Sequence, residues 1–353
     1  MTLRKGLIGL PIVKSAEREF AVLGLGEVLL RLSPPNKERI LAGEVFEKKA
    51  GGSELNVVSG ISLLGLRTGI ITKLPGNEIG KYIKNKIRFT GVSDDYIVYD
   101  SSDEARLGIY YYESGAAPRK PTVVYDRRHS SFTKFKLNDV PTDIYNKTAI
   151  FHVSGITMAL GESIRNTIFA MVKEFKAQGG LISFDVNYRG TLWTESQAKQ
   201  EIVKLLPYVD VLFISEETSR KMFQKQGSLR EIMESYALEY GCKLVATTQR
   251  TVLSPTKHTW NSIIYSQDEH QFLQEDPYQE IEVVDRIGSG DAYVAGVLFG
   301  LIKYNNVRTA LEFGNAMAAI KNTIPGDMPV SDWQEISQVI KEHQGKSTTE
   351  MNR

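Results

Sequence analysis

The chain has 353 residues, long enough for one large domain with a small accessory part or for two domains, and its 42% hydrophobic and 24% charged residues are ordinary for a globular protein. Its 43 basic residues balance 42 acidic ones, so it lacks the positive field of a nucleic-acid-binding protein. A single cysteine excludes an intrachain disulfide, and no apolar run is long enough to span a membrane. We therefore expect a cytoplasmic protein that acts on small molecules.

Strand-like apolar runs alternate with helical patterns along most of the chain. The expected strands cover residues 20–26, 68–74, 149–154, 181–185, 209–214 and 243–247. The expected helices cover residues 57–64, 79–89, 164–178, 229–240, 291–303 and 308–322. Such alternation predicts an α/β fold, with a mostly parallel central sheet and helices on both of its faces.

Two stretches interrupt this alternation, at about residues 28–47 and 106–125. They lack a helical period and are rich in residues that favour strands. We expect them to form a small β-sheet that acts as a lid over the main domain, residues 20–343. Residues 1–19 read as an N-terminal extension and 344–353 as a polar tail.

The strongest chemical signal is the segment 283–296, where a short apolar run enters a Gly-Ser-Gly-Asp turn and then an apolar helix. Successive backbone N–H groups of such a turn, at a helix N-terminus, form a cradle for phosphate. Asp291, at the end of the turn, could accept the proton of a hydroxyl that attacks phosphorus. Asp291 could equally be a helix N-cap, and four residues alone do not separate the two readings.

With this turn the sequence resembles the ribokinase-like (phosphofructokinase-B type) carbohydrate kinases, over about residues 20–340. Asp285 and residues 288–296 match the late signature of that family, and Gly51, Gly52 and Asn56 match its early one. The resemblance implies a three-layer fold, ATP and Mg²⁺. It also implies that Asp291 is the base, that Gly288, Ser289 and Gly290 form the anion hole, and that Gly52 and Asn56 bind the sugar.

Within the family the chain is most similar to 2-keto-3-deoxygluconate kinases, through residues 26–34, 185–193 and 324–327. The resemblance gives Arg189 the role of binding the substrate carboxylate, which a guanidinium can meet with two parallel hydrogen bonds. It makes Tyr110 a lid residue over the substrate and Asp327 a substrate contact. Some relatives have a second arginine where this chain has Tyr112, and Arg106 is a candidate for the missing charge.

The nucleotide side departs further from the family pattern. Asn315 opens a small-residue stretch, 315–319, that resembles the adenine-side helix, although a closely packed core helix would look the same. Arg250 is a candidate for the ATP phosphates, but Gln249 replaces the usual glycine. The segment 215–218 has lost both residues associated with metal, so the metal role passes only to Glu217.

The sequence thus predicts transfer of the ATP γ-phosphoryl group to the 6-hydroxyl of 2-keto-3-deoxygluconate. One alternative is a kinase for a neutral sugar such as fructose or ribose. Another is a non-catalytic sensor of sugar acids on the same fold. We also expect a homo-oligomer formed through the lid.

Overall fold

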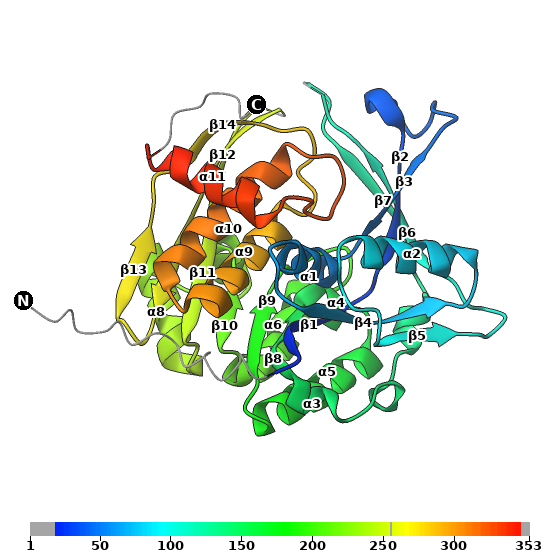
Figure 1. The fold of residues 1–353 in the computed structure, drawn as a ribbon, viewed down its shortest axis with the longest axis horizontal. Coiled ribbons are helices and arrows are strands. Elements are labelled where there is room, and N and C mark those ends of the chain that lie inside the picture. The colour runs from blue at the N-terminus through cyan, green and yellow to red at the C-terminus, as the bar shows by residue number, and fades with distance from the viewer. Residues whose placement is uncertain (1–17, 117, 255, 347–353) are drawn as a thin grey trace, which may run out of the picture.

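The computed structural model of the chain describes residues 18–116, 118–254 and 256–346 (Figure 1). The expected N-terminal extension falls outside these residues except for Arg18 and Glu19, and the expected C-terminal tail falls outside them beyond Lys346.

A ten-stranded sheet forms the centre of the molecule, in the order β13-β12-β11-β10-β9-β8-β1-β4-β5, with β14 paired to β12. Its strands are β1 (Phe20–Leu25), β4 (Thr68–Pro75), β5 (Ile97–Asp100), β8 (Thr148–Ser154), β9 (Leu181–Asp185), β10 (Val211–Phe213), β11 (Leu244–Ser254), β12 (Lys257–Ser266), β13 (Gln271–Gln274) and β14 (Tyr278–Glu282). The strands from β5 to β11 run parallel, and β12 to β14 are antiparallel. Strands of the parallel part are apolar and covered on both faces, as seen in β8, where every residue is buried.

Helices cover both faces of this sheet (Figure 1). They are α1 (Ser53–Leu63), α2 (Glu78–Phe89), α3 (Ile144–Lys147), α4 (Gly155–Met158), α5 (Glu162–Ala177), α6 (Glu195–Leu205), α7 (Glu216–Lys221), α8 (Leu229–Tyr240), α9 (Ser289–Tyr304), α10 (Val307–Asn322) and α11 (Trp333–His343). Short 3₁₀ turns lie at Pro35–Lys37, Ser131–Lys134, Leu137–Asp139 and Leu206–Tyr208.

Two separate hydrophobic cores correspond to the two faces. One core joins the sheet to α1, α2, α9, α10 and α11, and the other joins it to α3, α5, α6 and α8. Helices α9 and α10 pack along each other; a side chain at Gly296 would collide with the backbone of Phe313, its Cβ lying 2.4 Å from that carbonyl oxygen. The close contact of these two helices holds the start of α9 in a fixed place.

A second, four-stranded sheet lies beside the large one, in the order β3-β2-β6-β7. It consists of β2 (Leu29–Ser33), β3 (Glu47–Gly51), β6 (Gly108–Glu113) and β7 (Thr122–Asp126). Strands β2 and β6 pair in parallel, and β3 and β7 are added antiparallel at the two edges. Figure 1 shows this small sheet projecting from the α/β body beyond α1 and α2.

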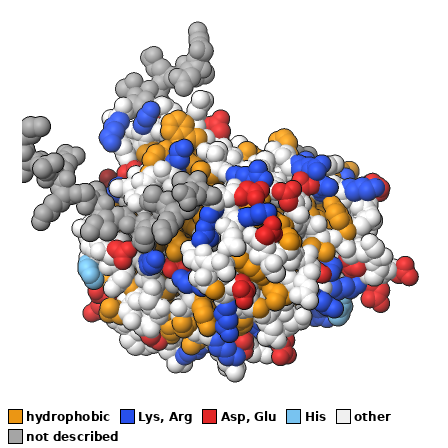
Figure 2. All heavy atoms as spheres, turned by 60° about the horizontal axis from the view of Figure 1, so that its bottom comes forward, with side chains coloured by type: hydrophobic (Ala, Val, Ile, Leu, Met, Phe, Trp, Pro, Cys, Tyr) orange, Lys and Arg blue, Asp and Glu red, His pale blue; other side chains and the backbone are white. Residues whose placement is uncertain are grey.

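The predicted fold class is confirmed: a mostly parallel sheet between helices, with a second small sheet. Figure 2 shows basic and acidic side chains interspersed on the face that it draws, without a continuous basic region. No helix among the described residues is long and apolar enough to cross a membrane.

Candidate active site

A cleft of about 930 Å³ lies between the small sheet and the large domain. Its walls come from the small sheet, from the starts of α1 and α9, from the carboxyl end of β9 and from residues 248–251 of β11. Open parallel sheets bind ligands at this edge, because the loops that follow the strands converge there. The cleft contains Gly52, Asn56, Tyr110, Asp291 and Asp327 from the predicted site.

Asp291 lies in the first turn of α9 and is 9% exposed. Its two carboxylate oxygens have separate donors, since Ser53 Oγ donates to Oδ1 at 2.8 Å and Asn56 Nδ2 donates to Oδ2 at 2.7 Å. Burial raises the pKa of Asp291, and the hydrogen bonds from Asn56 and Ser53 oppose that rise. The carboxylate is therefore held in one orientation while part of each oxygen remains free to accept a proton.

Asn56 has a second polar atom that faces the same region. Its Oδ1 is buried and has no hydrogen-bond partner among the residues that the structure describes. A buried acceptor without a partner costs free energy, which a donor on a bound ligand would recover. Asn56 can therefore fix Asp291 with one end of its amide and accept from a substrate hydroxyl with the other.

The glycines of the turn differ in what surrounds them. Gly288 caps α9 with a φ of 82°, and a Cβ there would lie 1.9 Å from the carbonyl oxygen of Asp327. Gly290 is exposed in the cleft, and a Cβ there would meet no atom within 4 Å. The first N–H groups of a helix have no intrahelical partner. Gly290 thus leaves open space directly in front of such donors, which fits a phosphate group.

Asp327 is enclosed between the two glycine segments and the small sheet. A Cβ on Gly51 would lie 2.1 Å from its Oδ2, and the Tyr110 hydroxyl donates to the same oxygen. Burial raises the pKa of Asp327, while Arg31, with Nη1 2.8 Å from Oδ1, works against that rise. The same Arg31 nitrogen lies 2.7 Å from Asp285 Oδ2, so one buried guanidinium joins two carboxylates.

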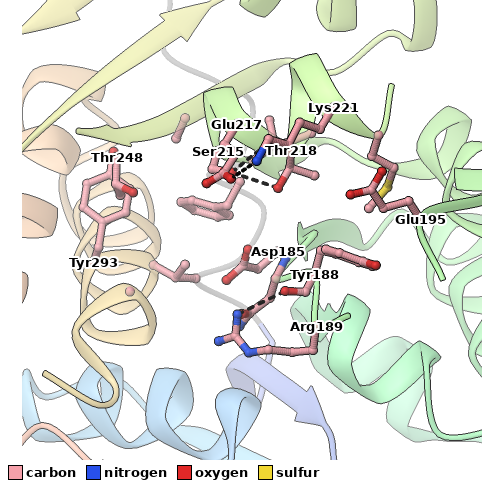
Figure 3. Close-up of a pocket in the computed structure, with 17 residues that line it drawn as sticks. Asp185, Tyr188, Arg189, Glu195, Ser215, Glu217, Thr218, Lys221, Thr248 and Tyr293 are labelled. Carbon is pink, nitrogen blue, oxygen red and sulfur yellow. Dashed lines mark hydrogen bonds and ion pairs between the residues drawn. The ribbon is translucent and has the colours of Figure 1, made fainter. Parts of the chain in front are cut away.

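A second cavity of about 410 Å³ continues from this cleft and shares Asp185, Arg189 and Gly290 with it. Figure 3 shows Asp185 and Arg189 on one side of the cavity, across from Ser215, Glu217 and Thr218. Burial and the nearby charge of Asp291 raise the pKa of Asp185 to about 7, and Arg189 partly offsets this. The carboxylates of Asp185 and Asp291 and the guanidinium of Arg189 therefore lie near one another where the two cavities join.

Two further arginines, Arg250 and Arg286, line the large cleft near Gly288 and Ser289. Burial lowers the pKa of Arg250, and the like charge of Arg286 lowers it further. Neither guanidinium has a hydrogen bond or an ion pair within the described parts of the chain. Two neighbouring cations without carboxylate partners make this end of the cleft suitable for an anion.

The comparisons with known proteins agree with this geometry. Residues 21–333 match the model of the pfkB family of carbohydrate kinases. The chain belongs to this family. A 2-dehydro-3-deoxygalactonokinase of Haloferax volcanii is 34% identical over 316 residues, covering 90% of this chain and 95% of the relative. The crystal structure of a 2-dehydro-3-deoxygluconokinase from Thermotoga maritima superposes with a TM-score of 0.86 at 33% identity, covering 91% of this chain and 99% of that one. A 5-dehydro-2-deoxygluconokinase of Clostridium botulinum is 26% identical over 92% of this chain and 94% of its own length.

In this pfkB carbohydrate kinase, the residue expected to bind metal on the nucleotide side, Glu217, has another partner. Glu217 lines both cavities, but its carboxylate is exposed and pairs with Lys221 Nζ at 2.6 Å, one turn along α7. The hydrogen bond from Lys221 lowers the pKa of Glu217. Among the described residues, no group of three or more His, Cys, Asp or Glu is placed to hold a metal ion.

The structure places two of the predicted residues outside the cleft of this kinase. Arg106 lines neither cavity, and its guanidinium pairs with Asp126 at 2.8 Å. Asn315 is buried in α10 and donates to Glu275 Oε1 at 2.7 Å, away from both cavities. The substrate and adenine contacts expected of these residues therefore have no support in this geometry.

Four residues of the site were given no role from the sequence. Ser53 donates to Asp291, Arg31 joins Asp285 to Asp327, Arg286 lines the cleft near Gly288, and Arg127 lines the cleft while bonded to Glu27. The positions of Ser53 and Arg286, inside the early and late signatures, were a signal that could have found them. Arg31 lies in the segment 26–34 that carries the resemblance, but its role, like that of Arg127, depends on partners that are distant in sequence.

Proposed function

We propose that this chain transfers the γ-phosphoryl group of ATP to the 6-hydroxyl of 2-keto-3-deoxygluconate, the 2-dehydro-3-deoxygluconate of the names above. The observation that carries the proposal is the buried Asp291 carboxylate, held by Ser53 and Asn56 beside the open space at Gly290. In this arrangement a hydroxyl bound next to Asp291 loses its proton to the carboxylate as its oxygen attacks phosphorus. The N–H groups at the start of α9 stabilise the charge that develops on the transferred group.

The nucleotide phosphates would lie across Gly290, between Arg250 and Arg286 on one side and Thr218 on the other. A nucleoside triphosphate carries several negative charges, which Arg250 and Arg286 can compensate. Asp185 supports the presence of a divalent cation here, because burial and the nearby charge of Asp291 raise its pKa, and a bound cation would compensate the charge of its ionised form. Mg²⁺ is usually held by phosphates and only one or two carboxylates, so Asp185 and Glu217 would be the residues that hold it together with the phosphates. The ion would supply positive charge to the transferring phosphoryl group.

A sugar acid, rather than a neutral sugar, is favoured by the cations that face the cleft. Arg189 lines both cavities, and among the described residues its guanidinium donates only to the carbonyl of Tyr188, at 3.2 Å, so most of its donors are free for a carboxylate. The named activities of the relatives support the same substrate class, since each of those proteins acts on a deoxy keto acid derived from a sugar. Two of these names differ only in the configuration of one hydroxyl, so both epimers belong in any test.

The test is an ADP-release assay of the purified chain with ATP and a panel of sugars. We expect turnover with 2-keto-3-deoxygluconate, or with its galactonate epimer, and little with fructose or ribose. Turnover confined to a neutral sugar would replace the acid by that sugar in the proposal. Binding of the acid without release of ADP would instead indicate a sensor.

We further propose that the small sheet is a lid, that it forms the contact between two copies of the chain, and that the protein is cytoplasmic. Strand β7 is paired on one side only, and Val124 on it is 49% exposed. An exposed apolar edge strand favours pairing with a second chain. Light scattering of Val124→Lys should show a smaller particle than the unmodified protein; an unchanged mass would exclude this contact.

A further inference from the structure

Lys321 is a lysine buried in an unusual place. It lies one residue before the end of α10 and is 1% exposed. Burying an ammonium group without compensation is costly, so a buried lysine usually has a carboxylate partner. Within the described residues no carboxylate oxygen lies within 4 Å of Lys321 Nζ; the amine donates instead to the carbonyl oxygens of Asp285, at 3.2 Å, and Ile324, at 3.1 Å.

These two carbonyls belong to the two loops that form the phosphate end of the cleft. Asp285 begins the segment that leads to Gly288 and Asp291, and Ile324 begins the loop that carries Asp327. The loops are also joined directly: Val284 N and Asp285 N donate to Asn322 O at 2.8 and 3.1 Å, and Gly326 N donates to Asp285 Oδ2 at 2.9 Å. The position of the anion hole therefore depends on how these loops are held together.

The charges around Lys321 explain why an ammonium can be kept there. Asp285, Asp327 and Asp291 favour its charged form, and Arg31 disfavours it. Arg31 contacts both Asp285 and Asp327, so one guanidinium faces two buried carboxylates. A second cation is needed to balance the two carboxylates beside Arg31, and Lys321 is the cation at this place.

We propose that the protonated amine of Lys321 is a built-in cation that holds the 285–291 turn against the 322–327 loop and so positions the anion hole and the base. Lys321 does not line either cavity, so it is a positioning residue and not a catalytic one. The inference deepens the proposed kinase function and rests on it. Its consequence is that turnover depends on the charge of a side chain that never touches the substrates.

Because the role of Lys321 depends on its charge, it predicts how turnover changes with pH. Burial lowers the pKa of Lys321 to about 8, so the ammonium is lost as the pH rises through that region. Arg31 and Tyr110, which adjoin the same carboxylates, have raised pKa values and keep their protons in this range. We therefore expect turnover to fall as the pH rises above about 8.

The stability of the fold should rise, while turnover falls, as Lys321 loses its proton. An unfolded lysine titrates near 10.4, so between the two pKa values the unfolded chain binds more protons than the folded one. The free energy of unfolding contributed by this group then increases as the pH rises from about 8. A decline in turnover without a decline in melting temperature separates loss of positioning from loss of the fold.

The experiment measures kcat, the KM for ATP and the melting temperature of the full chain from about pH 6 to about pH 9.5. It uses whichever sugar the unmodified protein phosphorylates, so a wrong substrate in the proposed function does not affect the outcome. Lys321→Met removes the charge, Lys321→Ala also opens space, and Lys303→Met on the exposed face of α9 is the matched control. For Lys321→Met we expect kcat to drop by about tenfold or more and the alkaline fall to disappear. Lys303→Met should behave as the unmodified protein.

Chemical rescue completes the test. Carbonyl oxygens bind small monovalent cations, so ammonium or potassium ions should restore part of the kcat of Lys321→Ala, and tetramethylammonium, which is too large, should not. The proposal is overturned if kcat of the unmodified protein stays constant to about pH 9.5 while the fold persists. It is also overturned if Lys321→Met keeps full kcat, or if folded Lys321→Ala does not respond to small cations. The alkaline profile of the unmodified protein decides the matter even if both variants fail to fold.

Discussion

The Arg31 guanidinium, on a strand of the small sheet, lies 2.7 Å from the carboxylate of Asp285, at the start of the turn that carries Asp291. Both side chains are almost fully buried, and the same nitrogen reaches Asp327 at 2.8 Å. Arg31 also stacks over the ring of Tyr112, 4.3 Å from its centre. The small sheet is thus tied by a buried ion pair to the segments that carry Asp291 and Asp327. Tyr112, expected from the resemblance to replace a second arginine, supports an arginine from the neighbouring strand in this structure.

Removing Arg31 should destabilise the protein strongly. Arg31→Met leaves two buried carboxylates without their cation, and breaking a buried pair in this way typically costs about 3–5 kcal/mol. The matched control is Arg67→Ala, which removes a surface pair with Glu19 and should cost about 1 kcal/mol or less. Urea denaturation measures both. Equal costs for the two variants would show that the buried contact contributes nothing special.

Alanine substitutions at the two glycines of the turn, Gly288 and Gly290, should have different effects on stability. Gly288→Ala forces a side chain into a φ of 82° and against the Asp327 carbonyl, so we expect a loss of about 1–3 kcal/mol or more in the free energy of unfolding. Gly290→Ala meets no atom of the protein, so stability should remain within about 1 kcal/mol of the original.

The methyl group of Gly290→Ala would instead occupy the space expected for phosphate. We therefore expect a higher KM for ATP or a lower kcat in a fold that melts normally. Full activity in Gly290→Ala would mean that the phosphates pass elsewhere, and a Gly288→Ala variant of normal stability would mean that the turn is less constrained than its geometry indicates.

Ser53→Ala should move the acid limb of the pH–rate profile. A base works only when deprotonated, so turnover falls as the pH drops through the pKa of Asp291. The hydrogen bond from Ser53 lowers that pKa, so its loss raises the pKa, and the fall in kcat begins at a higher pH. Ser62→Ala, on the same helix but away from the cleft, is the control. An acid limb that stays in place would separate Ser53 from the base.

Arg189→Ala should reduce activity selectively on the sugar acid. The guanidinium faces the cleft with free donors, and losing a charge-assisted contact to a carboxylate costs about 1.5–3 kcal/mol, or about a tenfold to hundredfold rise in KM. Arg106→Ala, outside the cleft and paired with Asp126, should leave the KM unchanged. A loss that is equal for acidic and neutral sugars in Arg189→Ala would remove its role as the carboxylate partner.

Elements with a strong local signal could be predicted from the sequence. The helix expected at 229–240 is α8 with the same bounds, because Ser228 and Glu231 form a capping box and Gly241 ends it with a positive φ. Strand β11 was expected to end at 247 and continues to Ser254, although its last residues are mostly exposed. Its extension depends on antiparallel pairing with β12, which is a long-range contact that no local pattern contains.

In the candidate site, too, residues in local signatures could be predicted, and residues that depend on long-range contacts could not. Asp291, Gly288 and Asn56 lie in short signatures, and the fold brings them together in the cleft. Arg31 could not be assigned, since it lies 296 positions before Asp327. Arg106 and Arg127 could not be told apart from composition, because only the path of the small sheet decides which one faces the cleft.

The most direct test of the central claim is turnover of Asp291→Asn with ATP and 2-keto-3-deoxygluconate, measured by ADP release. The amide keeps the shape of the side chain and can still bond Ser53, but it cannot take the proton of the hydroxyl. The account predicts a kcat lower by about a hundredfold to ten-thousandfold, with ATP affinity by calorimetry close to that of the unmodified protein. A variant that retains near-normal turnover on the sugar acid would contradict it.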